Sequence, residues 1–490
     1  SELTFLRQQI RALDAFQSIN HLSEITQQRR IISAAIKIAD YYLSQLDPHS
    51  VYIPPADVSD VNEQLMSNFK GIGIEFQQFR DSVFVTFVMK TGPAEKAGLQ
   101  IGDILLKADD SIQLSGKTWD GDEIRKRLRG PSNSKLTLLV KRGAANKLIV
   151  VERDNVPISS IDAAYLIQPG LGYIRINKFA DRTYESFMQA LEPLLKDSIQ
   201  SLVIDLRGNG GGLLSEAVAI ADELLAGNKL IVYTQGAHSP RVDYYSKREG
   251  LFESVKLTVL MDETSASASE VLAGALQDWD RATIVGRRSF GKGLVQQQFN
   301  LSNGGALRLT TARYYTPLGR DIQRPYTKGK LAYEHEFINR IQEDAQGIQD
   351  SAAKGIAYKT PKGHIVYGGG GIYPDKWIVS KDLILDSNYK VLYTDNLIND
   401  FVFKWYMKEQ VKINTFKNPA EFIKAYQGNA VWNELVQYAS PVQKAMLLKL
   451  GAEKKQIVQI FLITKTKQHG NNFFFRMDNR HNLQRMGCCK

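Results

Sequence analysis

After Pro157 the chain alternates short apolar strands with amphipathic helices, and this alternation constrains the fold more than any other feature. Strands are expected at Gly172–Ile176, Leu202–Leu206, Leu257–Met261, Ala282–Val285 and Leu307–Tyr315. Helices are expected between them at Tyr184–Leu195, Leu214–Leu225 and Ser269–Trp279. Strands that alternate with helices of about 10 to 15 residues are typical of an α/β domain with a largely buried sheet. We therefore predict such a domain over residues 157–378.

Three further regions are expected around this domain. Residues 69–156 hold short strands separated by Gly, Pro and Asp turns, which predict a small β-rich module. Residues 1–68 place apolar side chains at helical spacing, and residues 379–490 contain aromatic, Lys-rich amphipathic stretches. Both ends are therefore predicted to be mostly helical. Since 490 residues exceed what one hydrophobic core usually supports, we expect a multidomain protein that combines α+β and α/β parts.

The composition excludes several classes of protein. The hydrophobic and charged fractions, 43% and 23%, are those of an ordinary globular chain. No apolar stretch reaches the roughly 18–20 residues that cross a bilayer, so no integral membrane span is expected. Lys and Arg exceed Asp and Glu by 62 to 52, and no basic run is interleaved with aromatic residues. We therefore expect no nucleic-acid partner.

Cysteine and histidine give no sign of a metal or cofactor. The two cysteines, Cys488 and Cys489, are adjacent, and neighbouring cysteines seldom form a disulfide because the geometry is strained. The seven His show no metal-ligand spacing. We expect neither a metal nor a cofactor. The chain begins at Ser1 without Met or an apolar leader, which is consistent with a signal peptide that has been removed.

Three glycine- or serine-rich turns of the α/β part carry the candidate chemistry. The first, Asp205–Gly212, has the sequence D-L-R-G-N-G-G-G between a strand and a helix. Free N–H groups at a helix start, with glycines that admit a ligand, can bind an anion. A tight strand-to-helix turn is the plainer interpretation, but four glycines exceed what a turn requires.

The second turn, Thr264–Glu270, also lies between a strand and a helix. Ser267 and Glu270 fit a capping box, which explains both residues structurally. A serine at a sharp strand-to-helix turn is also where a nucleophile elbow presents its hydroxyl, and the next N–H then helps to form an oxyanion hole. The spacing leaves both interpretations open.

The third turn, Gly286–Gly293, reads G-R-R-S-F-G-K-G and resembles a Walker A loop, except that Gly293 replaces the Ser or Thr that binds magnesium. Lys292 then needs another role, and a buried Lys can deprotonate a serine if its pKa falls toward ~7–8. Gln296 can accept a hydrogen bond from that amine. Because residues four apart are neighbours on a helix but about 13 Å apart along a strand, this role predicts a helical Lys292–Gln296 segment.

Together these residues resemble the C-terminal processing (tail-specific) peptidases, a Ser–Lys protease family that carries a PDZ domain. The resemblance runs from Leu46 to Asp375, about two-thirds of the chain. It rests on seven blocks in the family's order: Leu46–Ser50, Gly92–Leu105, Asp205–Leu214, Ser265–Glu270, Phe290–Gln296, Ala312–Gln323 and Gly368–Asp375. Gly210 stands where the family usually has Pro, and Thr264 where it often has Gly.

The resemblance implies roles for five residues of the α/β domain. Ser267 would be the nucleophile, Lys292 the general base, and Gln296 the residue that orients Lys292. The N–H groups of Ala268 and of the Gly211 region would form the oxyanion hole. The implied activity is that of a serine endopeptidase that cleaves proteins near their C-termini through an acyl-enzyme.

The resemblance also implies that residues 69–156 form the PDZ domain and residues 157–378 the protease core. A substrate tail with an apolar end would add as a strand beside Ile72–Phe76. Gly71, Ile72, Gly73 and Ile74 would bind this tail, with its C-terminal carboxylate held by backbone N–H groups near Gly71 and Gly73. The family implies an exported protein of the periplasm or cell envelope. For residues 379–490 we expect dimerisation, bracing of the PDZ domain or adaptor binding.

Two other functions compete with this one. A PDZ scaffold with a decayed protease half is disfavoured by the intact Ser267, Lys292 and Gln296. A P-loop nucleotide hydrolase is favoured only by Gly286–Lys292.

Overall fold

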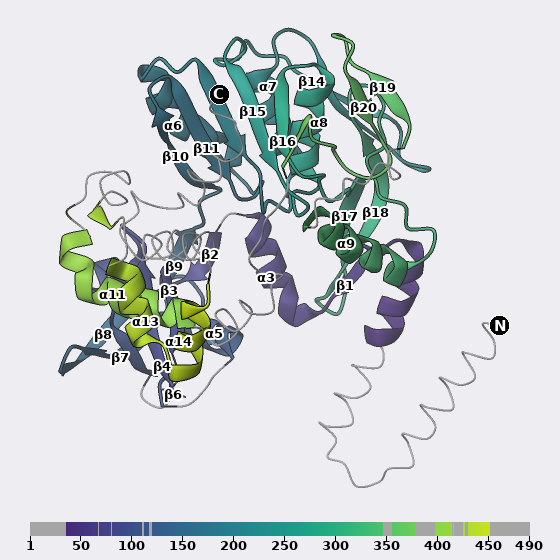
Figure 1. Cartoon of the computed structure of the whole chain (residues 1–490). Helices are drawn as coiled ribbons and strands as arrows, with labels where there is room; N and C mark the ends of the chain where they lie inside the picture. The colour runs from purple at the N-terminus through teal and green to yellow at the C-terminus, as the bar shows by residue number, and fades with distance from the viewer. Residues whose placement is uncertain are drawn as a thin grey trace, which may run out of the picture.

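The computed structural model describes residues 36–345, 355–378 and 397–450, apart from gaps at 67, 80, 110–111, 117–119, 414, 416–424 and 427–429. Figure 1 shows an α/β core and, beside it, a smaller β-rich module covered by the C-terminal helices. Helix α3 (Pro55–Leu65) lies between the core and the module (Figure 1). This confirms the predicted multidomain fold class, whereas the boundaries at 68, 156 and 378 stay predictions.

The core is built on a six-stranded sheet whose buried strands match the predicted apolar runs. Its order is β10 (Ile161–Gln168), β11 (Leu171–Ile176), β12 (Ser201–Asp205), β15 (Lys256–Met261), β16 (Ala282–Gly286) and β21 (Lys376–Trp377). The strands from β11 to β21 are parallel, and β10 is antiparallel to β11. The carboxyl ends of β12 and β15 therefore bring the first two candidate turns to the same edge of the sheet.

The three predicted helices of the core are α6 (Thr183–Lys196), α7 (Leu214–Leu224) and α8 (Ala268–Asp278). They pack with the sheet in one large apolar cluster that includes Phe187, Ile220 and Leu272. All residues of α8 are buried, as in a helix that runs through a core rather than along a surface. Burial on every side holds the first residue of α8, next to Ser267, in a fixed position.

A second sheet extends the core: β1 (Val51–Ile53), β18 (Ala306–Tyr315), β13 (Leu230–Gln235) and β14 (Val242–Tyr245), with β17 (Leu294–Asn300) paired to β18. The prediction that residues 1–68 are helical is wrong at β1, because pairing with β18 overrides the local preference. Residues 36–46 and α3 are helical as predicted. Residues 1–35 lie outside the described residues.

The β-rich module has a sheet in the order β3 (Ile74–Phe79), β4 (Ser82–Val88), β5 (Ile104–Ala108), β7 (Lys135–Arg142) and β8 (Ala145–Glu152), with β6 (Ile112–Gln113) beside β5. Helices α4 (Pro93–Lys96) and α5 (Gly121–Leu128) accompany it. At the two ends of the module, β2 (Asn68–Gly71) pairs with β9 (Asp154–Pro157). The strand β3 is at one edge of the sheet, where another strand can be added.

The C-terminal region is helical as predicted, within the residues described. Helices α11 (Leu397–Ile413), α13 (Ala430–Tyr438) and α14 (Pro441–Leu448) share an apolar core of their own. Phe403 of α11 stacks on Phe79 with ring centroids 4.8 Å apart and meets Phe84 at 5.1 Å. These contacts join the C-terminal helices to the module. No helix in the part of the chain described is both long and apolar enough to span a membrane.

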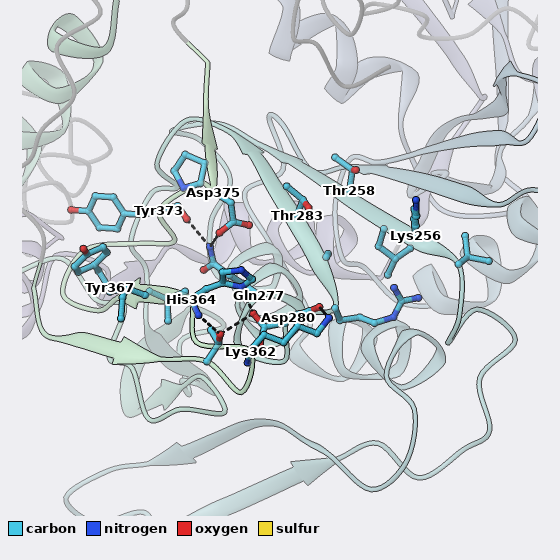
Figure 2. Close-up of a pocket in the computed structure, with 18 of the residues that line it drawn as sticks. Lys256, Thr258, Gln277, Asp280, Thr283, Lys362, His364, Tyr367, Tyr373 and Asp375 are labelled. Atoms are coloured by element: carbon cyan, nitrogen blue, oxygen red, sulfur yellow. Dashed lines mark hydrogen bonds and ion pairs between the residues drawn. The ribbon is translucent and has the colours of Figure 1, made fainter. Parts of the chain in front are cut away.

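A late segment, residues 355–378, returns to the core as predicted. It forms the hairpin β19 (Ala357–Lys359) and β20 (Ile365–Tyr367) and then contacts the carboxyl end of α8. Figure 2 shows Gln277 of α8 reaching this segment, where its amide donates to the Tyr373 carbonyl and the Asp375 carboxylate. The hollow in this view, about 1030 Å³, lies at the amino ends of β15 and β16. It is therefore at the opposite end of the sheet from Ser267.

Candidate active site

Ser267 lies at the sharp turn between β15 and α8 and has a strained backbone. Its φ of 56° and ψ of −115° are rare for a residue other than glycine. Such strain persists only where the surrounding structure holds it, and a strained strand-to-helix turn is the geometry of a nucleophile elbow. The cap interpretation holds as well, because the Ser267 N–H donates to the Glu270 carboxylate at 2.8 Å. The Ser267 turn is therefore both the cap of α8 and a strained strand-to-helix turn.

Glu270 connects the serine turn to the loop that carries Lys292, a role that the sequence analysis missed. Its Oε2 accepts from the N–H groups of Ser267 and Lys292, and its Oε1 from the Gly291 N–H and the Ser289 hydroxyl. Burial raises the pKa of this carboxyl group, and the four donors oppose that rise. The only signal in the sequence was the capping-box spacing, which accounts for one of the four hydrogen bonds.

Lys292 donates from its Nζ to Gln296 Oε1 at 2.9 Å, and the Gln296 amide donates to the His49 carbonyl at 2.8 Å. Burial lowers the pKa of Lys292, and the positive charge of Arg308 lowers it further. The amine is therefore biased toward its neutral, proton-accepting form. The predicted roles of Lys292 and Gln296 are compatible with this geometry.

The prediction of a helical Lys292–Gln296 segment is wrong. Leu294–Asn300 is the strand β17, and no helix begins at Lys292. The contact forms because a register irregularity between Val295 and Gln296 redirects the chain, and because the lysine side chain is long. The absence of a helix after Lys292 also removes the anion-binding helix start of a P-loop.

Tyr314 of β18 joins the serine turn and the lysine loop a second time. Its buried hydroxyl contacts the backbone carbonyls of Ser267 and Lys292. Burial raises the pKa of this phenol well above its ordinary value, so Tyr314 stays neutral. Two buried groups, Glu270 and Tyr314, therefore hold the two predicted catalytic residues next to each other.

The glycine-rich turn lies against the serine turn. A Cβ on Gly211 would lie 2.7 Å from the Ser267 Cβ and 2.9 Å from the Ala268 nitrogen, so only glycine fits. The Gly211 N–H donates to Asn209 Oδ1 at 2.9 Å, whereas Ala268 begins α8 and has an N–H that the helix itself leaves without an acceptor. Of the two predicted oxyanion donors, Ala268 is the better placed.

The segment 368–375 supports the lysine loop from outside. The Ser289 N–H donates to the Ile372 carbonyl, and the Ile372 N–H donates to the Ser289 hydroxyl at 2.6 Å. The Arg288 guanidinium donates to the Gly370 carbonyl. Because Ser289 also binds Glu270, this late segment and the serine turn meet at one side chain.

The predicted peptide-binding residues lie in the module, at its boundary with the core: Gly73 and Ile74 line a hollow of about 390 Å³ together with Ile161 and Asn177 of the core. Gly71 ends β2, Ile72 is buried, Gly73 has a positive φ of 76°, and Ile74 begins β3. They form the turn that leads to the free edge of β3. Apolar side chains, among them Phe69, Phe87 and Met89, form much of the lining of this hollow, as expected for a site that binds an extended peptide. No group of metal-ligating side chains occurs among the described residues.

Comparisons with known proteins agree on two parts of the chain. Residues 170–329 match the model of peptidase family S41, and residues 84–142 match a PDZ domain model. The chain is 37% identical to the carboxy-terminal-processing protease of Bartonella bacilliformis over 288 aligned residues. The aligned region covers 57% of this chain and 65% of that protein. It is 35% identical to a probable CtpA-like serine protease of Staphylococcus aureus over 277 aligned residues. The aligned region covers 56% of this chain and 55% of that protein.

Among solved structures, the photosystem II D1 C-terminal processing protease is similar at 26% identity and a TM-score of 0.38, covering 76% of this chain and 87% of that one. The chain spans between about half and two-thirds of the length of the curated relatives named above.

Proposed function

Since residues 170–329 belong to peptidase family S41 and residues 84–142 to the PDZ domain family, we propose that this chain is a serine endopeptidase that cleaves proteins near their C-termini. The observation that carries the proposal is the strained Ser267 turn, which two buried groups, Glu270 and Tyr314, join to the backbone of Lys292, a residue whose amine is desolvated. Such an arrangement serves no evident purpose in a scaffold protein, because positive φ at a serine costs stability.

In the proposed reaction, the neutral Lys292 amine removes the proton from the Ser267 hydroxyl as that oxygen attacks the scissile carbonyl. Gln296 orients the amine. The Ala268 N–H, at the positive end of α8, stabilises the oxyanion, with a second donor from the glycine-rich turn. Lys292 then protonates the leaving amine, and water hydrolyses the acyl-enzyme by the same base.

The PDZ domain supplies the preference for C-termini. A tail with an apolar end adds along the free edge of β3, and its carboxylate binds at Gly71–Ile74. Tethering the tail raises the effective concentration of the rest of the substrate at Ser267. We also propose that the protein is exported and acts in the periplasm or cell envelope.

The test is cleavage of an unfolded protein with an apolar C-terminus, with the products identified by mass spectrometry. Ser267→Ala should lower kcat about a million-fold and Lys292→Ala by a comparable factor, with the melting temperature unchanged. Ser186→Ala in α6 and Lys196→Ala at its exposed end are matched controls that should keep full activity. Full activity in Ser267→Ala would refute the mechanism.

The dependence of activity on pH provides a second readout. Because only the neutral amine accepts a proton, kcat/KM should rise as pH increases through the lowered pKa of Lys292, and the midpoint should lie below the ordinary lysine value. A wild-type protein that binds tails but cleaves nothing would be the PDZ scaffold. Binding of magnesium-ATP would instead favour the nucleotide hydrolase.

A further inference from the structure

Arg308 is a half-buried arginine on β18 that the proposed reaction does not use. It pairs across the sheet with Gln298 of β17, and the next pair on the same side joins Thr310 and Gln296. Alternate residues of a strand face the same side, so Arg308 lies diagonally across from the glutamine that binds the Lys292 amine. Its Nη2 donates to Gln298 Oε1 at 3.1 Å, which keeps the guanidinium in this position.

The other charged groups near Lys292 act in the opposite direction. Asp47, just before β1, and Glu270, on α8, both raise the pKa of Lys292, because a carboxylate stabilises an ammonium. His49 also lies nearby, and its pKa is lowered to about 4, so it is neutral at physiological pH and adds no charge. The charge of Arg308 therefore lowers the pKa of Lys292, against the carboxylates of Asp47 and Glu270, which raise it.

Helix α3 fixes this arrangement from the side of the PDZ domain. Asn62 accepts a hydrogen bond from the Gln298 amide at 3.0 Å, so Gln298 is held between α3 and Arg308. The next residue of α3, Glu63, forms an ion pair with Arg129 beside α5. The position of the Arg308 guanidinium thus depends on a helix that contacts both domains (Figure 1).

We propose that Arg308 is a positioning residue whose positive charge adds to the effect of burial in favouring the neutral, proton-accepting form of Lys292, and that α3 fixes this charge through Asn62 and Gln298. This inference rests on the proposed function, in which Lys292 is the general base. It concerns a residue outside the serine turn, the lysine loop and the glycine-rich turn.

The first experiment measures the ionisation of Lys292 without any catalysis. In the Ser267→Ala background, the amine is labelled with acetic anhydride over a range of pH, and modification of Lys292 is followed by mass spectrometry. Arg308→Gln should move the midpoint of labelling up by about 1 pH unit, since removing a nearby cation favours the ammonium. Arg308→Lys, which keeps the charge, should stay close to the parent.

Further variants separate charge from packing. Gln298→Leu and Asn62→Leu should give smaller upward shifts, because the guanidinium then relaxes toward solvent. Arg241→Gln removes an exposed arginine that pairs with Asp243 at the far sheet edge, and should change nothing. An unmoved midpoint in Arg308→Gln, or equal shifts in Arg308→Gln and Arg308→Lys, would overturn the inference. Should Arg308→Gln fail to fold, Gln298→Leu takes its place, and an unmoved labelling midpoint in that variant would overturn the inference.

The second experiment uses the active enzyme. In Arg308→Gln the acidic limb of the kcat/KM profile should move up by the same amount, which is about a tenfold loss of activity on that limb and little loss at high pH. A loss that is equal at every pH would show a merely structural role and contradict the inference. If no variant cleaves but the labelling shift appears, the proposed function fails while the effect of Arg308 on Lys292 stands.

Discussion

At the scale of single residues, the site depends on Glu270, a carboxylate that has no part in the proposed proton transfer. Glu270 is fully buried, and four N–H and O–H donors surround its two oxygens. Hydrogen bonds to a charged group are worth more than neutral ones, and a buried donor that loses its acceptor costs free energy. Glu270 therefore holds both predicted catalytic residues at the level of their backbone.

This argument predicts the behaviour of Glu270→Gln. The amide keeps the shape but places an NH2 group against two of the four donors. We expect the free energy of unfolding to fall by about 2–4 kcal/mol, measured by denaturant titration of the core. We also expect kcat to fall by about a hundredfold, because Ser267 and Lys292 lose their common support. Glu185→Gln, at an exposed pair with Arg182, is the control and should change neither quantity. Wild-type kcat in Glu270→Gln would contradict the role.

At the scale of elements, the glycine-rich turn after β12 and the serine turn after β15 pack without room for a side chain. Asn209 connects them, since its backbone carbonyl accepts from the Ala266 N–H and the Ser269 hydroxyl. Two adjacent glycines in this turn differ in the space that surrounds them. A Cβ on Gly211 would collide with the serine turn, whereas one on Gly210 would meet no atom within 4 Å.

The two glycines give a matched pair of variants. Gly211→Ala should lower kcat by about a hundred- to a thousandfold, the range seen when an oxyanion hole is disrupted, because the turn must move away from Ala268. Gly210→Ala should keep activity within about twofold, since its surroundings are open. Steady-state kinetics on one peptide substrate compare them. Equal losses in both variants would show that the turn acts through its flexibility and not through its fit.

At the scale of the whole molecule, the PDZ domain is held from two sides. On one side α3 carries the Glu63–Arg129 ion pair, and on the other the C-terminal helices insert Phe403 against Phe79 and Phe84. Of the roles expected for the C-terminal region, these contacts support bracing. Dimerisation and adaptor binding stay predictions.

The brace is tested by Phe403→Ala. Phe403 is 3% exposed, and loss of a buried phenylalanine typically costs about 3–5 kcal/mol. Amide hydrogen exchange should therefore speed up in β3 and β4. The helix α8 should stay protected, because it packs in the hydrophobic cluster of the core and not in that of the module. Phe299→Ala, at a ring that is 44% exposed on β17, is the control. Unchanged exchange in β3 would show that the helices do not brace the module.

The sequence by itself determined the residues at the three turns and most strands and helices of the core, but not the strands β10, β13, β14 and β17. These features are local: apolar periodicity sets strands and helices, and clusters of Gly and Ser mark the turns between them. The strands β11, β12, β15 and β16 and the helices α6 to α8 accordingly appear close to the expected residues. Pairings such as β1 with β18 leave no local signal, so the helical region expected over residues 1–68 does not include this strand.

Only the tertiary structure decided what surrounds the Lys292 amine. His49 and Gln296 are 247 residues apart in the chain, and Ser267 and Tyr314 are 47 apart, yet each pair is in hydrogen-bond contact. Burial and neighbouring charge set the pKa of Lys292, and both come from segments brought together by folding. No window of sequence around Lys292 contains this information, because the free energy of a charge depends on distance in space and not on distance along the chain.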